Sequence, residues 1–536
     1  MSADTNKKFK VFLPLILSLI LALGMFLGFK LRDAQGYKAA YFLRPGRLST
    51  VQEIINLIDV KYVDSVNGKS LKDEAINGLL SRLDPHSLYI PPDQLTSVNE
   101  DLEGNFEGIG VEFNIFGDTV NITSVISGGP SQASGLQTGD KIIRVDDSLV
   151  AGNHITAERI KKILRGPKGS EVKVTVLRNS QLMPFSIKRD VIPLHSVDAS
   201  YMLSKDIGYI KINRFAGNTY GEFMEAMLKL QKEGLKKLVI DLRQNPGGYL
   251  DAATNIADEL LDSNKLILYT QGKSYPRTNY NCQKPGVFEQ GPLVILVDEG
   301  SASASEILSG AVQDWDRGTI IGRRTFGKGL VQEQFGLNDG GALRLTVARY
   351  YIPSGRCIQK SYSNGIEAYD EDILNRYHDG ELVSADSIHF QDTTQYYTKL
   401  KHRVVHGGGG IVPDIFVPLD TTALDPLMNA LYMNNTLYDF AYEYYSHHQD
   451  DFKQYHSSAE FNERFSFTSA MLESFRQYAL KDSTVRAAQI TSQDEQEIAR
   501  RLKALLARQV WNTEGYYQVS NSTDPMVEKA ISVLDK

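Results

Sequence analysis

The sequence predicts a multidomain α/β protein in which a compact β-rich module precedes the main core and helical segments lie towards both ends. Residues 195–420 alternate strand-like and helix-like patterns joined by short loops, which is typical of an α/β core. Residues 104–190 contain five or six short strand patterns and two helical ones. The 536 residues leave room for two to four domains.

The composition indicates a globular protein. The chain is 42% hydrophobic and 23% charged, and its net charge of −7 argues against nucleic acid as a partner. The two cysteines, Cys282 and Cys357, do not have the spacing of metal ligands, so they are expected to be two free thiols or, alternatively, one disulfide. We expect no metal and no cofactor.

The N-terminus has the pattern of a membrane anchor. Lys7, Lys8 and Lys10 precede an uncharged stretch at residues 11–29, which at about 1.5 Å per residue reaches roughly 28 Å as a helix. Basic residues before such a stretch favour a cytoplasmic N-terminus and export of the remainder. We therefore expect a cytoplasmic tip and transmembrane anchor in residues 1–30 and a tether in 31–48. A cleaved signal peptide is the alternative.

Residues 49–100 read as a helical segment. Thr50 and Glu53 fit a capping box, and a second helix is expected around residues 71–83. It would end at the turn Asp84-Pro85-His86-Ser87. His86 is either a catalytic candidate or a polar residue in a helix-ending turn.

The β-rich module, assigned to residues 101–190, resembles a PDZ domain. The run Gly108-Ile109-Gly110-Val111 leads into a strand at 111–115, and a helix is expected at 156–164. In PDZ domains such a glycine-containing loop binds a peptide C-terminal carboxylate through backbone N–H groups. The resemblance implies that the peptide adds as a strand between the 111–115 strand and this helix.

A serine-rich loop follows the hydrophobic strand at residues 293–297. Ser303 precedes an apolar helix, and this junction exposes a hydroxyl beside the N–H groups and positive potential of a helix N-terminus. Ser301 and Ser305 are rival nucleophiles in the same loop. The alternative is that the serines only cap the helix.

Lys328 lies between two glycines, 25 positions after Ser303. No histidine is near either segment, so a serine nucleophile would need another base, such as a lysine. A free lysine has a pKa near 10.4, and burial beside Phe326 and Leu330 would lower it. The alternative is a solvated loop lysine.

Together these motifs resemble the carboxyl-terminal (tail-specific) processing proteases, Ser–Lys peptidases of family S41. Matching segments occur in order over roughly residues 50–420. They are Leu83–Ser87, Leu164–Gly169, Asp241–Arg243 with Asn245–Gly248, Ser301–Ile307, Gln313-Asp314, Arg317-Gly318, Thr325–Gly329 with Val331-Gln332, Tyr350–Gln359 and Gly410–Asp414.

The resemblance implies roles for individual residues. Ser303 would be the nucleophile, Lys328 the general base and Gln332 the residue that orients the lysine. The oxyanion hole would combine the N–H of Ala304 with one from the Gly247-Gly248 turn. Attack would give an acyl-enzyme that water releases.

The resemblance also implies an architecture and a regulation. The core at residues 191–420 would resemble the crotonase and Clp-protease folds. Arg165 matches an arginine that links the peptide-loaded PDZ domain to the active site in some members, so peptide binding would gate the enzyme. A catalytically inactive PDZ receptor and a crotonase-like acyl-CoA enzyme are the rival functions.

Partners and location follow from the same resemblance. We expect substrates with free, apolar C-termini, a homodimer or larger homo-oligomer, and no nucleic acid. The expected location is the bacterial inner (cytoplasmic) membrane, crossed once, with the catalytic part on the periplasmic side. The helical C-terminal extension, residues 421–536, departs from the simplest family pattern and would be a dimerisation element, an adaptor site or a lid.

Overall fold

The computed structural model describes residues 18, 20–25, 50–126, 128–262, 264–390, 393–421, 425–481, 485 and 490–536. The chain divides into two compact units, Met1–Leu79 and Leu80–Lys536. The expected anchor at 11–29 lies mostly outside the described residues, and its tether at 31–48 lies wholly outside them. Within the described ranges, the structure contains no helix long and apolar enough to span a bilayer.

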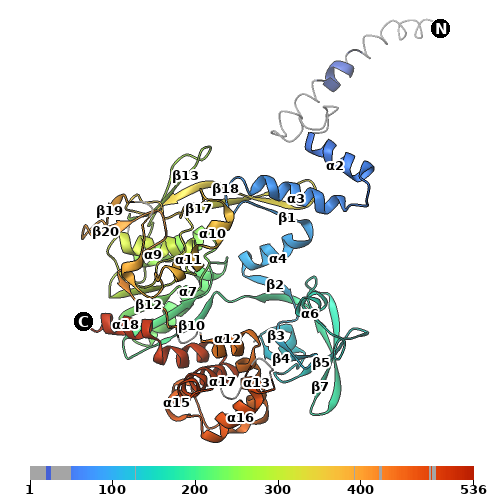
Figure 1. The fold of residues 1–536 in the computed structure, drawn as a ribbon, viewed down its shortest axis with the longest axis vertical. Helices are drawn as coiled ribbons and strands as arrows, with labels where there is room; N and C mark the ends of the chain where they lie inside the picture. Colours follow the sequence, from blue (N-terminus) through green and yellow to red (C-terminus); the bar gives the residue numbers. More distant parts are fainter. Residues whose placement is uncertain are drawn as a thin grey trace, which may run out of the picture. The chain divides into compact units, whose positions relative to one another are not determined.

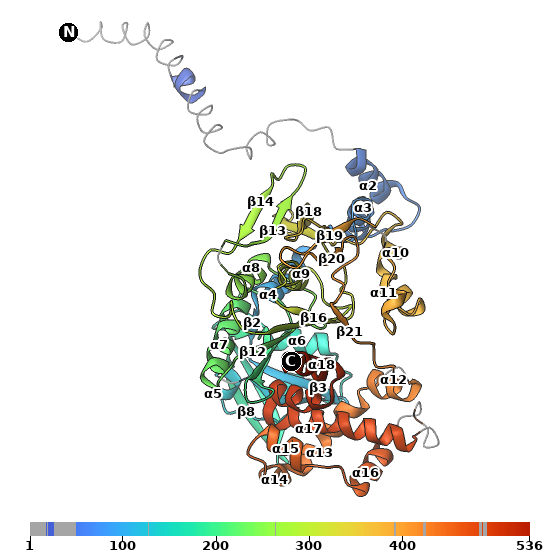
Figure 2. The same cartoon turned by 90° about the vertical axis from the view of Figure 1, so that its left-hand side faces the viewer.

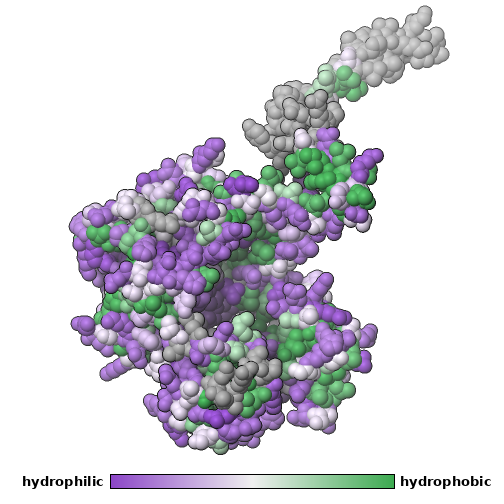
Figure 3. Space-filling view, in the orientation of Figure 1, coloured by the Kyte–Doolittle hydropathy of each residue, from purple (hydrophilic) through white to green (hydrophobic). Residues whose placement is uncertain are grey.

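After the helical residues 20–25, the chain forms helices α2 (Thr50–Lys61) and α3 (Gly68–Leu80). No residue of α2 is buried, and four of its apolar side chains are about half exposed or more, as the green surface over this helix shows (Figure 3). They are Val51, Ile54, Leu57 and Val60.

The prediction of a helical segment at 49–100 missed one short strand. Leu88–Ile90 forms strand β1, followed by α4 (Pro92–Glu103). Strand β1 pairs antiparallel with β18 (Ala342–Tyr351), some 250 residues later in the chain. Because prolines precede and follow this strand, a helix cannot run through it.

The PDZ-like module is carried on a two-stranded ribbon, because β2 pairs antiparallel with β9 where the chain enters and leaves it. Its sheet has the order β3-β4-β5-β7-β8, with β6 paired to β5. The expected helix is confirmed as α6, capped by Thr156. The elements are β2 (Asn105–Gly108), β3 (Val111–Phe116), β4 (Thr119–Val125), α5 (Pro130–Ala133), β5 (Lys141–Val145), β6 (Ser148–Leu149), α6 (Ala157–Leu164), β7 (Glu171–Arg178), β8 (Gln181–Lys188) and β9 (Asp190–Pro193).

The core contains a six-stranded sheet of order β10-β11-β12-β15-β16-β21. All neighbouring strands are parallel except β10 and β11, and this confirms the expected α/β core. The strands are β10 (Val197–Met202), β11 (Ile207–Ile212), β12 (Lys237–Asp241), β15 (Leu293–Val297), β16 (Thr319–Gly322) and β21 (Ile415–Phe416).

Helices cover both faces of this sheet (Figures 1 and 2). Ile210, Ile240 and Ile295 pack on one face with α7 (Thr219–Lys232), α8 (Leu250–Leu260) and α9 (Ala304–Asp314). The opposite face packs against α18 (Pro525–Leu534), the last helix of the chain. The end of the C-terminal extension therefore completes the core.

A second, antiparallel sheet lies beside α9 and carries the lysine loop. Its order is β1-β18-β13-β14, and β17 pairs with β18. The strands not yet bounded are β13 (Leu266–Gln271), β14 (Thr278–Asn281) and β17 (Leu330–Gly336). Short elements follow: α10 (Ile366–Asp370), α11 (Asp372–His378), η1 (Ala385–Ser387), β19 (Gln395–Tyr397) and β20 (Val404–His406).

The C-terminal extension is helical, as expected, and has a hydrophobic core of its own. Its longest helix, α17, begins with a capping box: the Thr491 side chain accepts a hydrogen bond from the Asp494 N–H, and the Asp494 side chain accepts one from the Thr491 N–H. The elements before α18 are α12 (Pro426–Met433), α13 (Thr436–His447), α14 (Gln449–Phe452), α15 (Ser458–Arg464), α16 (Ser469–Ala479), α17 (Ser492–Ser520) and η4 (Asn521–Thr523).

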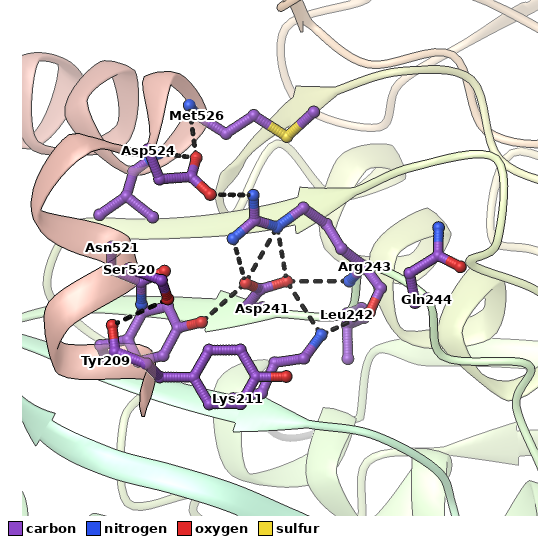
Figure 4. A network of polar contacts seen from close by, with 12 residues as sticks. Tyr209, Lys211, Asp241, Leu242, Arg243, Gln244, Ser520, Asn521, Asp524 and Met526 are labelled. Atoms are coloured by element: carbon purple, nitrogen blue, oxygen red, sulfur yellow. Dashed lines mark hydrogen bonds and ion pairs between the residues drawn. The ribbon is translucent and has the colours of Figure 1, made fainter. Parts of the chain in front are cut away.

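A buried polar network joins the extension to the core sheet (Figure 4). Asp241, at the end of β12, accepts hydrogen bonds from Tyr209, Lys211 and Arg243. Arg243 also donates to Asp524, the N-cap of α18, at 2.6 Å. Burial alone would raise the pKa of Asp241, but the charges of Arg243 and Lys211 hold it well below its usual range. The network therefore keeps Asp241 ionised inside the protein.

Candidate active site

Ser303 lies where strand β15 passes through a short loop into helix α9. It is the N-cap of α9, with φ 52° and ψ −111°, a backbone conformation that non-glycine residues rarely adopt. Ser303 is partly exposed, whereas Ser301 and Ser305 are fully buried. The buried hydroxyls donate to the carbonyls of Leu242 at 2.8 Å and Asn245 at 2.9 Å. Of the three serines, Ser303 therefore has the hydroxyl that a substrate can reach.

Lys328 lies in the loop between β16 and β17 and lines the same cleft as Ser303. Its pKa is lowered by burial, and the nearby positive charge of Arg344 lowers it further. The charges of Glu306 and Asp84 act in the opposite direction. A lysine in this setting is a better base than a solvated one, since less energy is needed to remove its proton.

Glu306 joins the serine loop to the lysine loop. Its fully buried carboxylate accepts hydrogen bonds from the backbone N–H groups of Ser303 at 2.8 Å, Gly327 at 2.7 Å and Lys328 at 2.8 Å. Thr325 donates its hydroxyl to the same carboxylate. Burial raises the pKa of Glu306 to about 7, although these four hydrogen bonds favour the ionised form. One side chain thus fixes the backbone of both candidate catalytic residues.

Tyr350, on strand β18, supports the two loops from the other side. Its buried hydroxyl lies 2.7 Å from the carbonyl of Lys328 and 3.1 Å from that of Ser303. Together with Glu306, it leaves the loops little freedom to change their separation.

Two backbone N–H groups are available beside Ser303 as an oxyanion hole. Within the described residues, neither the Ala304 N–H nor the Gly248 N–H donates a hydrogen bond to the protein. The Gly247 N–H, by contrast, donates to the side chain of Asn245 at 2.9 Å. The geometry therefore favours Gly248 over Gly247 as the donor from this turn.

Gly247 allows the close approach that this arrangement requires. A Cβ atom on Gly247 would lie 2.8 Å from both the Ser303 Cβ and the Ala304 nitrogen. Any side chain at this position would force the turn away from the start of α9.

Gln332 lines the cleft on strand β17, four residues after Lys328. Its side-chain amide donates to the carbonyl of His86 at 2.5 Å, so its observed partner is the turn that precedes β1. The family role, orienting Lys328, remains a prediction. The His86 ring packs against Tyr369, with its Nε2 2.8 Å from the tyrosine oxygen. Burial and the charge of Lys328 lower the pKa of His86 to about 4, so it is neutral at pH 7.

The cleft has a volume of about 680 Å³ and is open to solvent. Apolar side chains line part of it, while Lys328, Arg344, Asp251 and Glu333 are its charged lining residues. The apolar residues are Leu102, Leu250, Ile307, Leu330 and Val331. The described ranges contain no cluster of side chains suited to a metal ion.

The PDZ-like module has a smaller groove of about 100 Å³ between β3 and α6. Ile109, Gly110 and Val111 line it, as the carboxylate-loop prediction requires, and so does Arg165. Gly108 ends strand β2, just before this loop. Arg165 pairs with Glu100 of α4 at 2.7 Å and lies over the Phe106 ring. It therefore joins the groove to the helix that leads to the cleft.

Sequence reasoning missed Glu306, Tyr350 and Arg344 as members of the site. Glu306 stands within the recognised serine motif, three residues after Ser303, and its position as N3 of the helix was the available signal. Tyr350 begins one of the matching segments, but nothing local indicated its role, and Arg344 carries no local signal, because the pairing of β18 with β17 brings it to the cleft.

Comparisons with known proteins give matches to three parts of the chain. The profile of peptidase family S41 matches residues 206–370, a PDZ-domain profile matches 108–188, and a family of unknown function matches 427–512. A solved structure titled photosystem II D1 C-terminal processing protease is 29% identical and covers 57% of this chain and 84% of that one, with a TM-score of 0.34.

Two curated relatives are similar over 58% of the chain. A probable CtpA-like serine protease of Staphylococcus aureus is 35% identical, and the match spans 62% of its length. A carboxy-terminal-processing protease of Bartonella bacilliformis is 34% identical, and the match spans 73% of its length. The chain therefore belongs to the carboxy-terminal-processing proteases, serine hydrolases of peptidase family S41.

Proposed function

We propose that the protein is a membrane-anchored serine endopeptidase that cleaves protein substrates at or near their C-termini by a Ser–Lys mechanism. The observation that carries this proposal is the placement of Ser303 and Lys328 in one cleft, with their backbones joined through Glu306. The partly exposed hydroxyl, the lysine of lowered pKa and the two available N–H groups supply a nucleophile, a base and an oxyanion hole.

The mechanism has two halves. The Ser303 oxygen attacks the scissile carbonyl as neutral Lys328 takes the hydroxyl proton. The negative charge that develops on the carbonyl oxygen is stabilised by the N–H groups of Ala304 and Gly248. Lys328 then gives its proton to the leaving amine, which leaves an acyl-enzyme. Water, deprotonated by Lys328, releases the acyl product and restores Ser303.

The PDZ domain supplies substrate selection in this proposal. Its groove suits an extended peptide that ends beside Gly110 and places apolar side chains against Val111 and Leu164. Arg165 is paired with Glu100 of α4, so a peptide bound in the PDZ groove would change the cleft by displacing this helix. Cleavage would then depend on a substrate with a free C-terminus.

The proposal includes a location and an assembly. Residues 11–29 would anchor the chain in a bacterial inner membrane, with the catalytic part on the periplasmic side. The exposed apolar side chains of α2 support a homodimer or larger homo-oligomer. Alkaline extraction of membranes and sedimentation of the detergent-solubilised chain test these two points separately.

The decisive experiment follows cleavage of an unfolded protein with an apolar C-terminus by the full chain in detergent. Ser303→Ala and Lys328→Ala should each reduce the rate by about 10⁴-fold or more. Ser301→Ala and Ser305→Ala are the controls, since their hydroxyls are occupied inside the protein. Retention of full cleavage by Ser303→Ala would show that the nucleophile lies elsewhere.

A further inference from the structure

Arg344 is a cation in the candidate cleft that contacts no reacting atom in the mechanism above. It lies on strand β18, opposite Gln334 of β17, and lines the same cleft as Ser303 and Lys328. Its guanidinium is partly buried and donates one hydrogen bond, at 3.1 Å, to the side-chain oxygen of Gln334. A guanidinium has five N–H donors, so most of the donors of Arg344 form no hydrogen bond with the described residues.

No carboxylate of the described chain neutralises this guanidinium. The cleft contains two acidic side chains, Asp251 and Glu333, but among the described residues Arg344 forms an ion pair with neither. Glu333 instead accepts a hydrogen bond from Tyr275 at 2.6 Å. Other arginines of the core do have such partners: Arg243, Arg323, Arg324 and Arg356 each pair with an aspartate or glutamate.

An unpaired, partly buried arginine is costly unless something binds it. Removing a guanidinium from water without an anionic partner is unfavourable, and here burial already lowers the pKa of Arg344. Its position beside Lys328 adds repulsion between two like charges. A substrate carboxylate in the cleft would relieve both effects, and a planar guanidinium is well suited to hold it with two parallel hydrogen bonds.

We propose that Arg344 is a specificity-determining residue that binds a carboxylate of the substrate in the cleft, close to the scissile bond. This rests on the proposed peptidase function and names the substrate class: segments that carry a negative charge near the point of cleavage. The carboxylate comes either from an acidic side chain or from the free C-terminus of a substrate cut near its end. The PDZ groove is a separate site on β3 and α6 and does not include Arg344.

The test compares cleavage of matched peptides by the full chain in detergent. One series replaces successive residues around the scissile bond by Glu or by Gln in peptides whose C-terminus is amidated. A second series compares one peptide as the free acid and as the amide. We expect the wild-type enzyme to favour the charged member in one of the two series by about 10- to 100-fold in kcat/KM, the range for a charge-assisted hydrogen bond.

Arg344→Gln should abolish this preference, and Arg344→Lys should retain part of it. The readout is the ratio of kcat/KM for the charged peptide to kcat/KM for the neutral one. Loss of Arg344 also raises the pKa of Lys328 and so slows the cleavage of every substrate alike, which leaves this ratio unaffected. Arg349→Gln is the matched control: Arg349 is on the same strand but bonds to Tyr362 and does not line the cleft. Arg344→Glu should reverse the preference towards peptides with Lys in place of Gln.

If Arg344→Gln lowers the ratio of kcat/KM for the Glu peptide to that for the Gln peptide, the group bound by Arg344 is an acidic side chain. If it lowers the ratio for the free acid to that for the amide, the group is the C-terminal carboxylate. Unchanged ratios in both series would overturn the proposal. Because the PDZ groove is intact in every variant, its contribution cancels in these comparisons. Binding of the same peptides to the Ser303→Ala protein, measured by fluorescence anisotropy, tests Arg344 without catalysis. If the wild-type protein cleaved no substrate, the proposed peptidase function would be refuted, but this binding test of Arg344 could still be made.

Discussion

The backbone N–H of Ser303 donates a 2.8 Å hydrogen bond to the carboxylate of Glu306, three residues further along the chain. The same carboxylate oxygen accepts the N–H of Lys328 at 2.8 Å. Because one oxygen holds both backbones, a buried glutamate sets the spacing of the proposed nucleophile and base.

Glu306→Gln should change how stability depends on pH. The pKa of Glu306 is raised to about 7 in the folded chain from 4.5, so its stabilising effect is complete below about pH 4.5 and is lost as the pH rises through 7. The difference corresponds to about 3 kcal/mol. The urea midpoint of the wild-type core should therefore fall, relative to that of Glu306→Gln, between pH 4.5 and 7. Parallel profiles would contradict this.

The pH dependence of cleavage should report the charges around Lys328. The base must be neutral, so kcat/KM should rise with pH through the lowered pKa of Lys328. Arg344→Gln removes a neighbouring positive charge and should move this limb to higher pH, while Asp84→Asn removes a negative charge and should move it to lower pH. A neutral, amidated peptide is the substrate for this profile. If both variants shifted this limb of the pH profile in the same direction, Lys328 would not be the group that titrates in it.

Gly248→Ala should impair the proposed oxyanion hole. Gly248 has φ 144°, and a Cβ atom there would lie 2.0 Å from the Phe215 carbonyl oxygen, so the turn must move. We expect a loss of about 10²- to 10³-fold in kcat. Gly336→Ala is the control, because no atom lies within 4 Å of its added Cβ. A wild-type kcat in Gly248→Ala would exclude this N–H from the reaction.

The ion pair between Arg243 and Asp524 should decide how firmly α18 covers the core sheet. Asp524→Ala leaves Arg243 without one of its two carboxylate partners and removes the N-cap of α18, and loss of a helix N-cap alone typically costs about 1 kcal/mol. Hydrogen exchange in α18 should accelerate. Glu528→Ala, at an exposed position of the same helix, should leave exchange unchanged.

The PDZ domain and the C-terminal extension meet at a pair of aromatic rings. Phe116 of β3 stacks on Tyr442 of α13, with ring centroids 4.9 Å apart. Phe116→Leu and Tyr442→Leu should therefore show a coupling of about 1 kcal/mol in a double-mutant cycle. Hydrogen exchange in β3 of the wild type, the two single variants and the double variant measures this coupling free energy. If the free-energy changes of the two single variants simply add in the double variant, the two rings are not in contact in solution.

Much of the fold was predictable from the sequence because its signals are local. Alternation and apolar runs gave the core strands, Thr156 marked the start of α6, and glycines marked the turn at 247–248 and the PDZ loop. Strand β1 was missed. Leu88–Ile90 is a strand only because β18 provides a strand for it to pair with.

The sequence by itself determined which residues stand in the serine and lysine motifs, because those motifs are short and their chemistry depends on residue type and spacing. Only the tertiary structure decided which of three serines reaches the cleft, which glycine N–H is available, and that Arg344 lies beside Lys328. Exposure, hydrogen-bond occupancy and the electrostatic field at a side chain depend on groups far apart in the chain, which only folding brings together.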